Sequence, residues 1–361
     1  MLRIPSVLAR PIAAPHLPRM QNLPLGVVDQ SPVRNGGTAE DAIRETLELA
    51  RICERLGYRR YWLAEHHSTN SFAGSSPAVL IPAVAAATRE MRIGSGGVLL
   101  THYSPYRVAE KFRMAEILAP GRIDLGVGRA PGGTGGATAA LRYGRDAIPV
   151  ERFGEQVADL VEWLRDGFEP GHPWRRVRAT PRSATAPPVW ILGSGGETAR
   201  LAGELGRGYA FAQFISGLDG ADAFRAYREH FRPSHDFAEP RAILALGVVC
   251  AETTEEAVRL ALSNELWRMR IIRGEDRGIP TPEQAEQEFP AAGFDLDRIR
   301  AEILDDPRVL VGDPDRVRDG LRRLAEHYHA DEILIVTVTW SHEARVRSYE
   351  LVAEAMGLAP G

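Results

Sequence analysis

Glu65, His66 and His67 form the most reactive cluster of side chains in this sequence. An imidazole titrates near neutral pH, so either histidine is suited to act as a general base. Two alternatives stay open: a histidine that only hydrogen-bonds a loop, and a metal site that takes His102 as a third ligand. Because the spacing matches no HExxH motif, we expect catalysis by His66 and His67 without a metal.

A second cluster is a glycine-rich run that contains Ser95, Gly96 and Gly97. Glycine inside a strand gives up side-chain packing, and it is tolerated where a ligand or another backbone approaches closely. A flat aromatic ring lying against this strand would account for the glycines. A bulge without a ligand is the alternative.

Two further segments suit the binding of an anion. Gly193, Ser194, Gly195 and Thr198 lie where a predicted strand meets a helix, and the free N–H groups of a helix N-terminus favour phosphate. An ordinary strand-to-helix turn explains these glycines equally well. Arg129 follows another predicted strand, where a guanidinium could clamp a phosphate or a reduced flavin ring. A structural salt bridge is the alternative for Arg129.

The elements that must position these groups alternate between short apolar runs and amphipathic helical stretches. Runs rich in Val, Ile and Leu are typical of parallel strands that helices cover. Eight such runs, each followed by a helix, predict the α/β class and a (β/α)8 TIM barrel, since doubly wound sheets usually have fewer strands. The predicted strands span residues 23–29, 60–64, 91–100, 122–127, 188–192, 209–214, 242–250 and 332–338.

The candidate groups share one position in this pattern. In a TIM barrel the active site lies at the carboxyl ends of the strands, and the histidines, the glycine run, Arg129 and the segment 193–198 all follow or end a strand. We therefore expect them to converge. Irregular segments at residues 128–150 and 271–307 are expected to form loops or a lid over the site, and residues 167–187 are expected on the opposite side.

The composition limits the classes of protein to which this chain could belong. The chain has 361 residues and a formal net charge of −4, which gives no sign of nucleic-acid binding. Two cysteines, Cys53 and Cys250, exclude a disulfide framework and suggest buried thiols in the reducing cytoplasm. No apolar run is long enough to span a bilayer. We expect residues 1–20 to be a disordered extension, with a transit peptide as the alternative, and residues 21–361 to form one domain.

Together these motifs resemble the luciferase-like monooxygenase family, in particular the bacterial flavin-dependent oxidoreductases that are similar to bacterial luciferase. The resemblance implies a TIM barrel, usually a homodimer, that binds FMN non-covalently. A separate flavin reductase would supply the electrons, since the chain shows no second nucleotide-binding domain. The stretches that carry the resemblance are GYRRYWLAEHH, IGSGGVLLTHYSPYRVAEKF, GRIDLGVGRAPGG, WILGSGGETARLAGELG and VGDPDRVRDGL.

Carried over to this sequence, the resemblance assigns a role to several candidates. His66 matches the catalytic base, with His67 as its neighbour, and Arg129 matches the arginine that contacts the flavin phosphate. Ser194 and Thr198 fall in the phosphate loop.

The resemblance also implies a backbone feature and a reaction. Gly96 and Gly97 lie where the family often has a non-proline cis peptide beside the flavin, whereas Gly193 stands where luciferase has an acid. The implied reaction uses reduced FMN and O2 to oxidise a small organic substrate. A dehydrogenase that uses the deazaflavin F420 and a non-catalytic flavin-binding protein are the alternatives.

Overall fold

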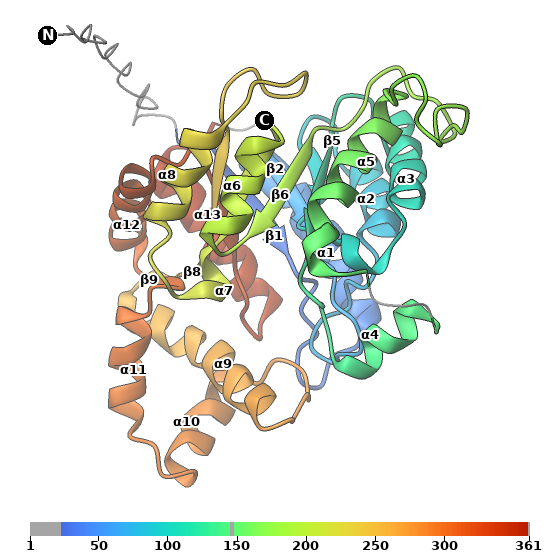
Figure 1. Ribbon diagram of the computed structural model, residues 1–361. Helices are drawn as coiled ribbons and strands as arrows, with labels where there is room; N and C mark the ends of the chain where they lie inside the picture. The colour runs from blue at the N-terminus through green and yellow to red at the C-terminus, as the bar shows by residue number, and fades with distance from the viewer. Residues whose placement is uncertain (1–22, 145–147, 360–361) are drawn as a thin grey trace, which may run out of the picture.

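The computed structural model describes residues 23–144 and 148–359, so the prediction for residues 1–20 lies outside the described residues. Within them, parallel strands pair in the order β1-β2-β3-β5-β6-β7-β8, and β10 pairs with both β8 and β1, which closes the sheet into a barrel. The predicted (β/α)8 TIM barrel is therefore confirmed (Figure 1). The barrel strands are β1 (Leu25–Asp29), β2 (Arg60–Leu63), β3 (Arg92–Ser95), β5 (Ile123–Gly128), β6 (Val189–Gly193), β7 (Gly208–Ala212), β8 (Ala242–Cys250) and β10 (Glu332–Val336).

Strands such as β1, β8 and β10 are buried on both faces, which explains why their sequences are continuous apolar runs. Side chains alternate along a strand, so neighbouring residues enter different cores. Val28, Trp62 and Leu334 pack together inside the barrel. Their neighbours Val27 and Tyr61 pack outward against the helices.

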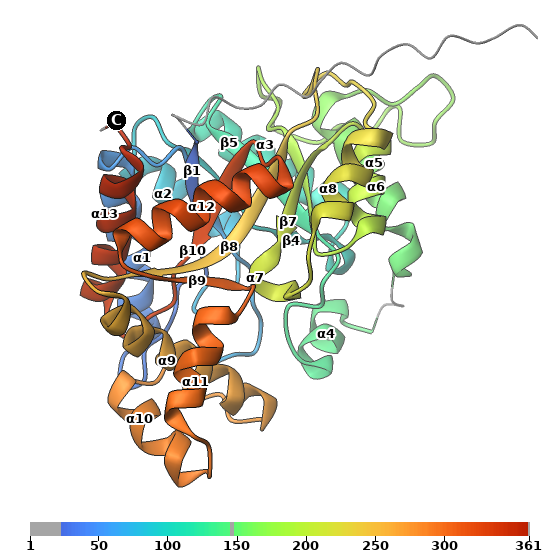
Figure 2. The ribbon, with the colours of Figure 1, turned by 90° about the vertical axis from the view of Figure 1, so that its left-hand side faces the viewer.

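The helices that follow the strands surround the barrel, and α12 and α13 pack on the outer face of β8 (Figure 2). The start signals in the sequence act as expected: Thr38 forms a capping box with Asp41 at the first turn of α1. These helices are α1 (Ala39–Arg55), α2 (Pro77–Ala87), α3 (Pro105–Leu118), α5 (Phe153–Arg165), α6 (Gly196–Glu204), α8 (Ala221–His230), α12 (Pro314–Tyr328) and α13 (His342–Met356).

The third predicted strand differs from the prediction because it is interrupted. β3 ends at Ser95, and β4 (Val98–Leu99) pairs separately with β5. The Gly96–Gly97 peptide between them is cis, as the resemblance implies. A short 3-10 helix, η1 (Leu100–His102), follows β4.

The irregular segment expected at residues 271–307 is largely helical. α9 (Thr254–Ile272) leads into α10 (Pro282–Ala291) and α11 (Leu296–Asp305), and β9 (Val309–Gly312) then pairs with the carboxyl half of β8. Buried Leu266, Phe289, Ile303 and Val311 give this insertion a small core of its own. The insertion stands beyond the carboxyl ends of the barrel strands, on the same side as α4 (Gly135–Arg142) (Figure 1).

The amino end of the barrel is filled by buried ion pairs. Arg60 reaches Asp124 and Glu332, both at 2.6 Å, and Trp62 Nε1 donates to Asp124 at 3.1 Å. A pocket of about 760 Å³ opens beside these residues. None of the predicted site residues lines this pocket, and this end of a TIM barrel usually serves stability rather than catalysis.

Two smaller expectations concern the thiols and membranes. Cys53 and Cys250 are free and buried, as predicted. Among the described helices, none combines the length and the apolar character that crossing a bilayer requires.

Candidate functional site

His66 lies in the loop after β2, where burial and aromatic contacts fix its ring. Its backbone N–H donates to the Gly74 carbonyl at 2.9 Å. The centroid of its imidazole lies 4.7 Å from the centroid of the Phe72 ring. Nδ1 is buried without a hydrogen-bond partner among the described residues. Burial first, and the neighbouring His67 second, lower the pKa of His66 to about 4, so this ring is neutral at neutral pH.

His67 has a carboxylate partner. Its Nε2 lies 2.8 Å from Oε1 of Glu65, whose side chain is only 2% exposed. The backbone N–H of His67 donates to the Gly132 carbonyl. Glu65 also accepts from the Tyr103 hydroxyl at 2.6 Å and from the Leu99 N–H at 3.1 Å. Burial and the contact with Glu65 raise the pKa of Tyr103, so its hydroxyl stays protonated. The structure thus brings Glu65, His67 and Tyr103 together, whereas the His66 ring packs against Phe72.

The glycine run leaves a bare stretch of backbone at the end of β3. Ser95 is fully buried, and its hydroxyl donates to the Gly126 carbonyl at 2.8 Å, so only its backbone could face a ligand. Gly96 and Gly97 are partly exposed. A Cβ on Gly97 would stand 2.9 Å from the Gly126 carbonyl oxygen, and one on Gly96 would stand 3.1 Å from Trp62 Cβ. The close approach of the neighbouring strand therefore requires glycine at position 97 and leaves little room for a side chain at position 96, so this stretch presents no side chain to a flat ring.

The loop from β6 into α6 leaves a helix N-terminus open. Gly195 is the N-cap of α6 and supplies no side-chain hydrogen bond, and no atom lies within 4 Å of a Cβ built on it. Ser194 is exposed, whereas Thr198 is buried and packs against Gly193 beneath the loop. The first-turn N–H groups of α6 are therefore free to meet an anion, and there is space for one.

Arg129 lies beside this helix N-terminus. Its guanidinium stands 3.8 Å from the Glu197 carboxylate in the first turn of α6, and the two side chains are 39% and 91% exposed. An exposed pair at that distance is held weakly. The ion pair expected as the alternative is therefore present, but it leaves Arg129 available to a stronger anion.

Strand register places the histidines and the anion site on one rim. Arg129 follows Gly128, which pairs with Leu99, and the Leu99 N–H binds Glu65 beside His67. β5 also pairs with β6, which leads to the open end of α6. The candidates predicted from separate motifs therefore all lie at the carboxyl ends of neighbouring strands.

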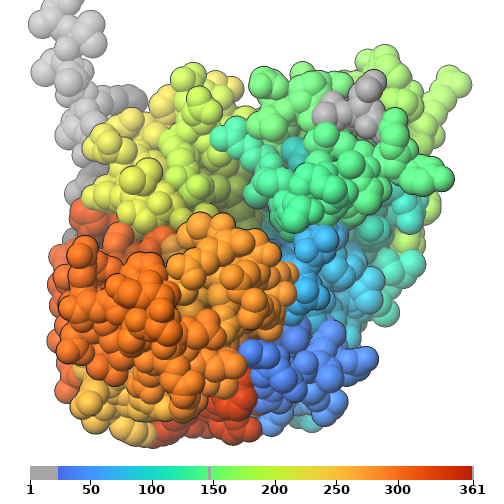
Figure 3. Space-filling view, turned by 90° about the horizontal axis from the view of Figure 1, so that it is seen from below, coloured from blue at the N-terminus to red at the C-terminus, as the bar shows by residue number. Residues whose placement is uncertain are grey.

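The insertion after β8 docks beside His66 through residues that the sequence analysis did not single out. Trp267 of α9 contacts Phe72 edge-on at 5.2 Å, and its Nε1 donates to Ser71 Oγ at 2.8 Å. Asp276 binds the same loop, through the Asn70 N–H at 2.5 Å and through the Ser71 hydroxyl. Seen from this end, the surface of the insertion (orange) adjoins the surface formed by the early part of the described chain (blue) (Figure 3). Contacts that join positions 196 residues apart leave no local signal in the sequence.

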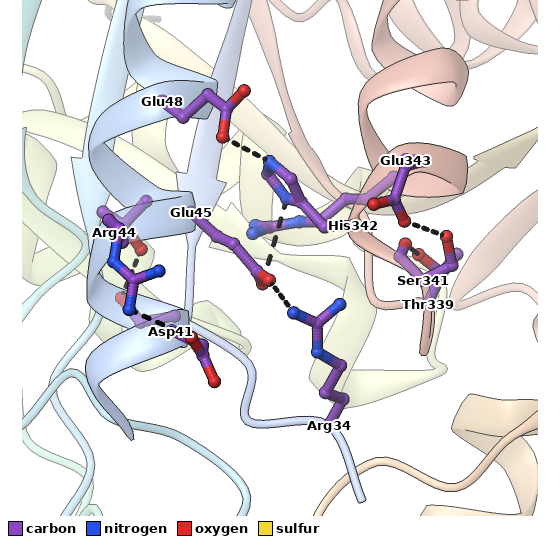
Figure 4. Close-up of polar contacts among 12 residues, drawn as sticks. Arg34, Asp41, Arg44, Glu45, Glu48, Thr339, Ser341, His342 and Glu343 are labelled. Atoms are coloured by element: carbon purple, nitrogen blue, oxygen red, sulfur yellow. Dashed lines mark hydrogen bonds and ion pairs between the residues drawn. The ribbon is translucent and has the colours of Figure 1, made fainter. Parts of the chain in front are cut away.

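A polar cluster at the start of α13 holds the loop after β1 (Figure 4). Arg34 reaches Glu45 at 2.5 Å, and His342 faces Glu45 at 3.9 Å and Glu48 at 3.5 Å. The next residue, Asn35, donates its N–H to the Ile279 carbonyl at 2.7 Å. The cluster therefore supports the loop on which the insertion rests.

His102 contacts the loop after β5 and forms no hydrogen bond with His66 or His67 among the described residues. Its Nε2 is 2.9 Å from the Pro131 carbonyl oxygen. Within the described residues no group of three or more His, Cys, Asp or Glu side chains could hold a metal ion.

Known proteins share this sequence and fold. A sequence model of the luciferase-like monooxygenase family matches residues 23–330. The N-acetyl-S-alkylcysteine monooxygenase of Bacillus subtilis (strain 168) is 36% identical over 336 residues, which cover 92% of this chain and 98% of that protein. The crystal structure of apo-MsnO8 superposes with a TM-score of 0.86 at 38% identity, covering 95% of this chain and 100% of that one.

More distant structures share the fold alone. The oxygenating constituent of 3,6-diketocamphane monooxygenase of Pseudomonas putida, solved in complex with FMN, has a TM-score of 0.66 at 20% identity, covering 94% of this chain and 100% of that one. An F420-dependent secondary alcohol dehydrogenase has the same TM-score at 14% identity, covering 92% of this chain and 99% of that one. The family match and the identity over most of both chains show that this protein belongs to the luciferase-like monooxygenase family.

Proposed function

We propose that this protein is an FMN-dependent monooxygenase that takes reduced FMN from a separate reductase and uses O2 to oxidise a small organic substrate. One observation carries the proposal: an uncapped helix N-terminus faces an available arginine on the same rim as a histidine pair. An anion site and a proton-transfer site lie together, with bare glycine backbone between them.

The residues present fit FMN. The free N–H groups of α6, the Ser194 hydroxyl and Arg129 offer donors and charge to a phosphate, and the space above Gly195 admits it. Gly96 and Gly97 offer a surface without side chains to the ring. When bound, reduced FMN would supply the electrons that activate O2.

The side chains around that site would bind the substrate, enclose it and transfer protons. Phe72 and Trp267 form an apolar wall beside His66, suited to an alkyl or thioether group, because sulfur makes favourable contacts with aromatic rings. The relative named as an N-acetyl-S-alkylcysteine monooxygenase supports a thioether as the first substrate class to test. His66 and His67 would move protons, and the insertion would keep water out.

We also propose a cytoplasmic homodimer. Val79 on α2 and Met114, Ile117 and Leu118 on α3 are exposed apolar side chains on two helices that pack together. Apolar groups gathered in this way favour association with a second copy.

Cofactor binding tests the proposal directly. The purified protein is titrated with FMN and with F420, and oxygen uptake is then measured with reduced FMN and a panel of thioethers, aldehydes and alkanesulfonates. We expect FMN binding and substrate-dependent oxygen uptake. Preference for F420 would favour the dehydrogenase of the same fold. FMN binding without turnover on any substrate would favour a non-catalytic flavin protein.

His66→Ala separates catalysis from binding. We expect turnover to fall on the order of 10²-fold, since general acid–base groups contribute about that much or more, with FMN affinity kept. Unchanged turnover at unchanged affinity would remove the catalytic role of His66.

A further inference from the structure

A second pocket, here called the amino-end pocket, lies at the opposite end of the barrel from the candidate functional site. It is the pocket of about 760 Å³ that opens beside Arg60. This volume falls within the range of about 300–1,000 Å³ that is typical of sites for small molecules. None of the residues assigned to the FMN site lines it, so a ligand bound here would leave that site free.

Arg60 and Glu332 form a charged floor of this pocket that keeps one donor and one acceptor unused. Each side chain is 5% exposed, and Arg60 Nε donates to Glu332 Oε1 at 2.6 Å. Arg60 Nη1 donates to Asp124, whose oxygens also accept from Arg92 and Trp62. Among the described residues, Arg60 Nη2 and Glu332 Oε2 have no hydrogen-bond partner, and neither is one of the unpartnered atoms closed to solvent. The pocket therefore presents an N–H donor beside a carboxylate oxygen.

These two free atoms match the head group of an α-amino acid. A carboxylate accepts hydrogen bonds from a guanidinium, and an ammonium donates them to a carboxylate. An α-amino acid carries both groups on one carbon, and the free donor and acceptor lie on two side chains joined by a hydrogen bond of 2.6 Å. A simple anion would satisfy Arg60 but repel Glu332, and a simple cation would do the reverse. Because burial penalises an unmatched charge, the floor favours a zwitterion.

The charges around the pocket are also balanced. Six arginines and six acids line it, so no large excess of one sign selects a simple ion. On the exposed rim, Arg59 and Arg241 form no ion pair with a described acid, which leaves them free to attract a carboxylate. Asp331, whose side chain is 26% exposed, lines the same pocket and attracts an ammonium.

An aromatic wall beside the charged floor would hold an apolar side chain. Trp190, Phe237 and Ile243 line the pocket and belong to the core inside the barrel. Phe237 meets Trp190 edge-on at 5.1 Å, and the Arg60 guanidinium lies over the Trp190 ring at 5.0 Å. The floor and the wall are therefore adjacent, so one small molecule can contact both.

We propose that the amino-end pocket is a binding site for a free α-amino acid with a large apolar side chain. The carboxylate of this ligand binds Arg60, its ammonium binds Glu332, and its side chain packs on Trp190 and Phe237. The site is separate from the chemistry proposed above and involves no reaction step. Because the ligand binds only the folded barrel, it stabilises the protein against unfolding.

Calorimetric titration of the whole protein tests this site with defined compounds. The probe is L-phenylalanine. Phenylpropanoate lacks the ammonium, phenethylamine lacks the carboxylate, and glycine lacks the apolar side chain. We expect L-phenylalanine to bind, and each of the other compounds to bind roughly tenfold more weakly or worse, because each loses one of the three interactions. Addition of FMN should leave the Kd of L-phenylalanine unchanged.

Variants locate the binding in this pocket. Phe237→Ala removes part of the wall, and Glu332→Gln removes the charge that faces the ammonium, so each should weaken L-phenylalanine binding roughly tenfold. The matched controls are Phe294→Ala, an exposed aromatic side chain on the insertion, and Glu90→Gln, an exposed acid outside the pocket. Both controls should keep the wild-type Kd. Circular dichroism shows whether each variant folds, and if Glu332→Gln does not, Phe237→Ala and the series of compounds still decide.

Several results would overturn the proposal. One is the absence of L-phenylalanine binding at millimolar concentration. Another is equal affinity for phenylpropanoate, which would indicate a site for simple anions. An unchanged Kd in Phe237→Ala and Glu332→Gln would place the ligand elsewhere, and displacement of L-phenylalanine by FMN would place it at the other end of the barrel.

Discussion

Removing the Arg129 side chain should weaken the binding of FMN but not of riboflavin. Arg129 is bound only weakly to Glu197, at 3.8 Å with both side chains exposed. Its removal should therefore change the stability of the folded protein little. A hydrogen bond to a charged group contributes about 1.5–3 kcal/mol, and the exposure of Arg129 favours the lower value. About 1.4 kcal/mol is tenfold in affinity, so Arg129→Ala should raise the Kd of FMN roughly 10- to 30-fold.

Riboflavin supplies the internal control because it has the same ring and no phosphate. Flavin fluorescence gives both affinities, and the ratio of the two Kd values isolates the contact with the phosphate. Arg129→Lys should recover part of the loss, and the whole effect should shrink as salt rises. Glu197→Gln should tighten FMN binding severalfold, since the carboxylate that competes for Arg129 is gone. Equal weakening of FMN and riboflavin by Arg129→Ala would refute the phosphate clamp.

Three further outcomes follow from burial and packing. The lowered pKa of His66 means that, as pH falls from about 6.5 to about 4, the unfolded chain takes up a proton that the folded one does not. The free energy of unfolding should then drop by about 3 kcal/mol at most over this pH range, as measured by urea titrations at its two ends. His66→Gln should make that drop smaller. Asp276→Asn weakens the bond to Ser71, so amide exchange of the insertion should speed up about tenfold while the barrel stays protected. Gly126→Ala should cost on the order of 3 kcal/mol or prevent folding, because its Cβ would stand 2.1 Å from the Ser95 carbonyl oxygen; an unchanged melting temperature would contradict this.

The barrel was predictable because its signals are local. Buried strands appear as apolar runs, and the residues after them alternate at helical spacing, so the order of elements can be inferred without contacts. The insertion was mispredicted as irregular although its signals were visible. Thr281 forms a capping box with Gln284 around Pro282, and Asp295 caps the next helix. These caps predict helices even where charged residues and prolines obscure the apolar periodicity of the sequence.

The site was predictable in position but not in contacts. The carboxyl-end rule places His67 and Arg129 on one rim, because it needs only the strand ends. It does not show that Thr198 is buried beneath its loop, or that the Ser95 hydroxyl is engaged. Nor could it reveal Trp267 beside Phe72, since that contact depends on how the insertion folds back over the barrel.

The different surroundings of the two histidines show why position alone is insufficient. His66 and His67 are adjacent, and the resemblance favours His66, but adjacent residues in a loop point in different directions. One ring enters an apolar pocket against Phe72, where a charge is disfavoured, and the other meets a carboxylate. That carboxylate belongs to Glu65, and only the fold shows that its other acceptor positions are used by Tyr103 and Leu99. The surroundings of each imidazole therefore depend on contacts between distant residues, which the histidine motif alone does not show.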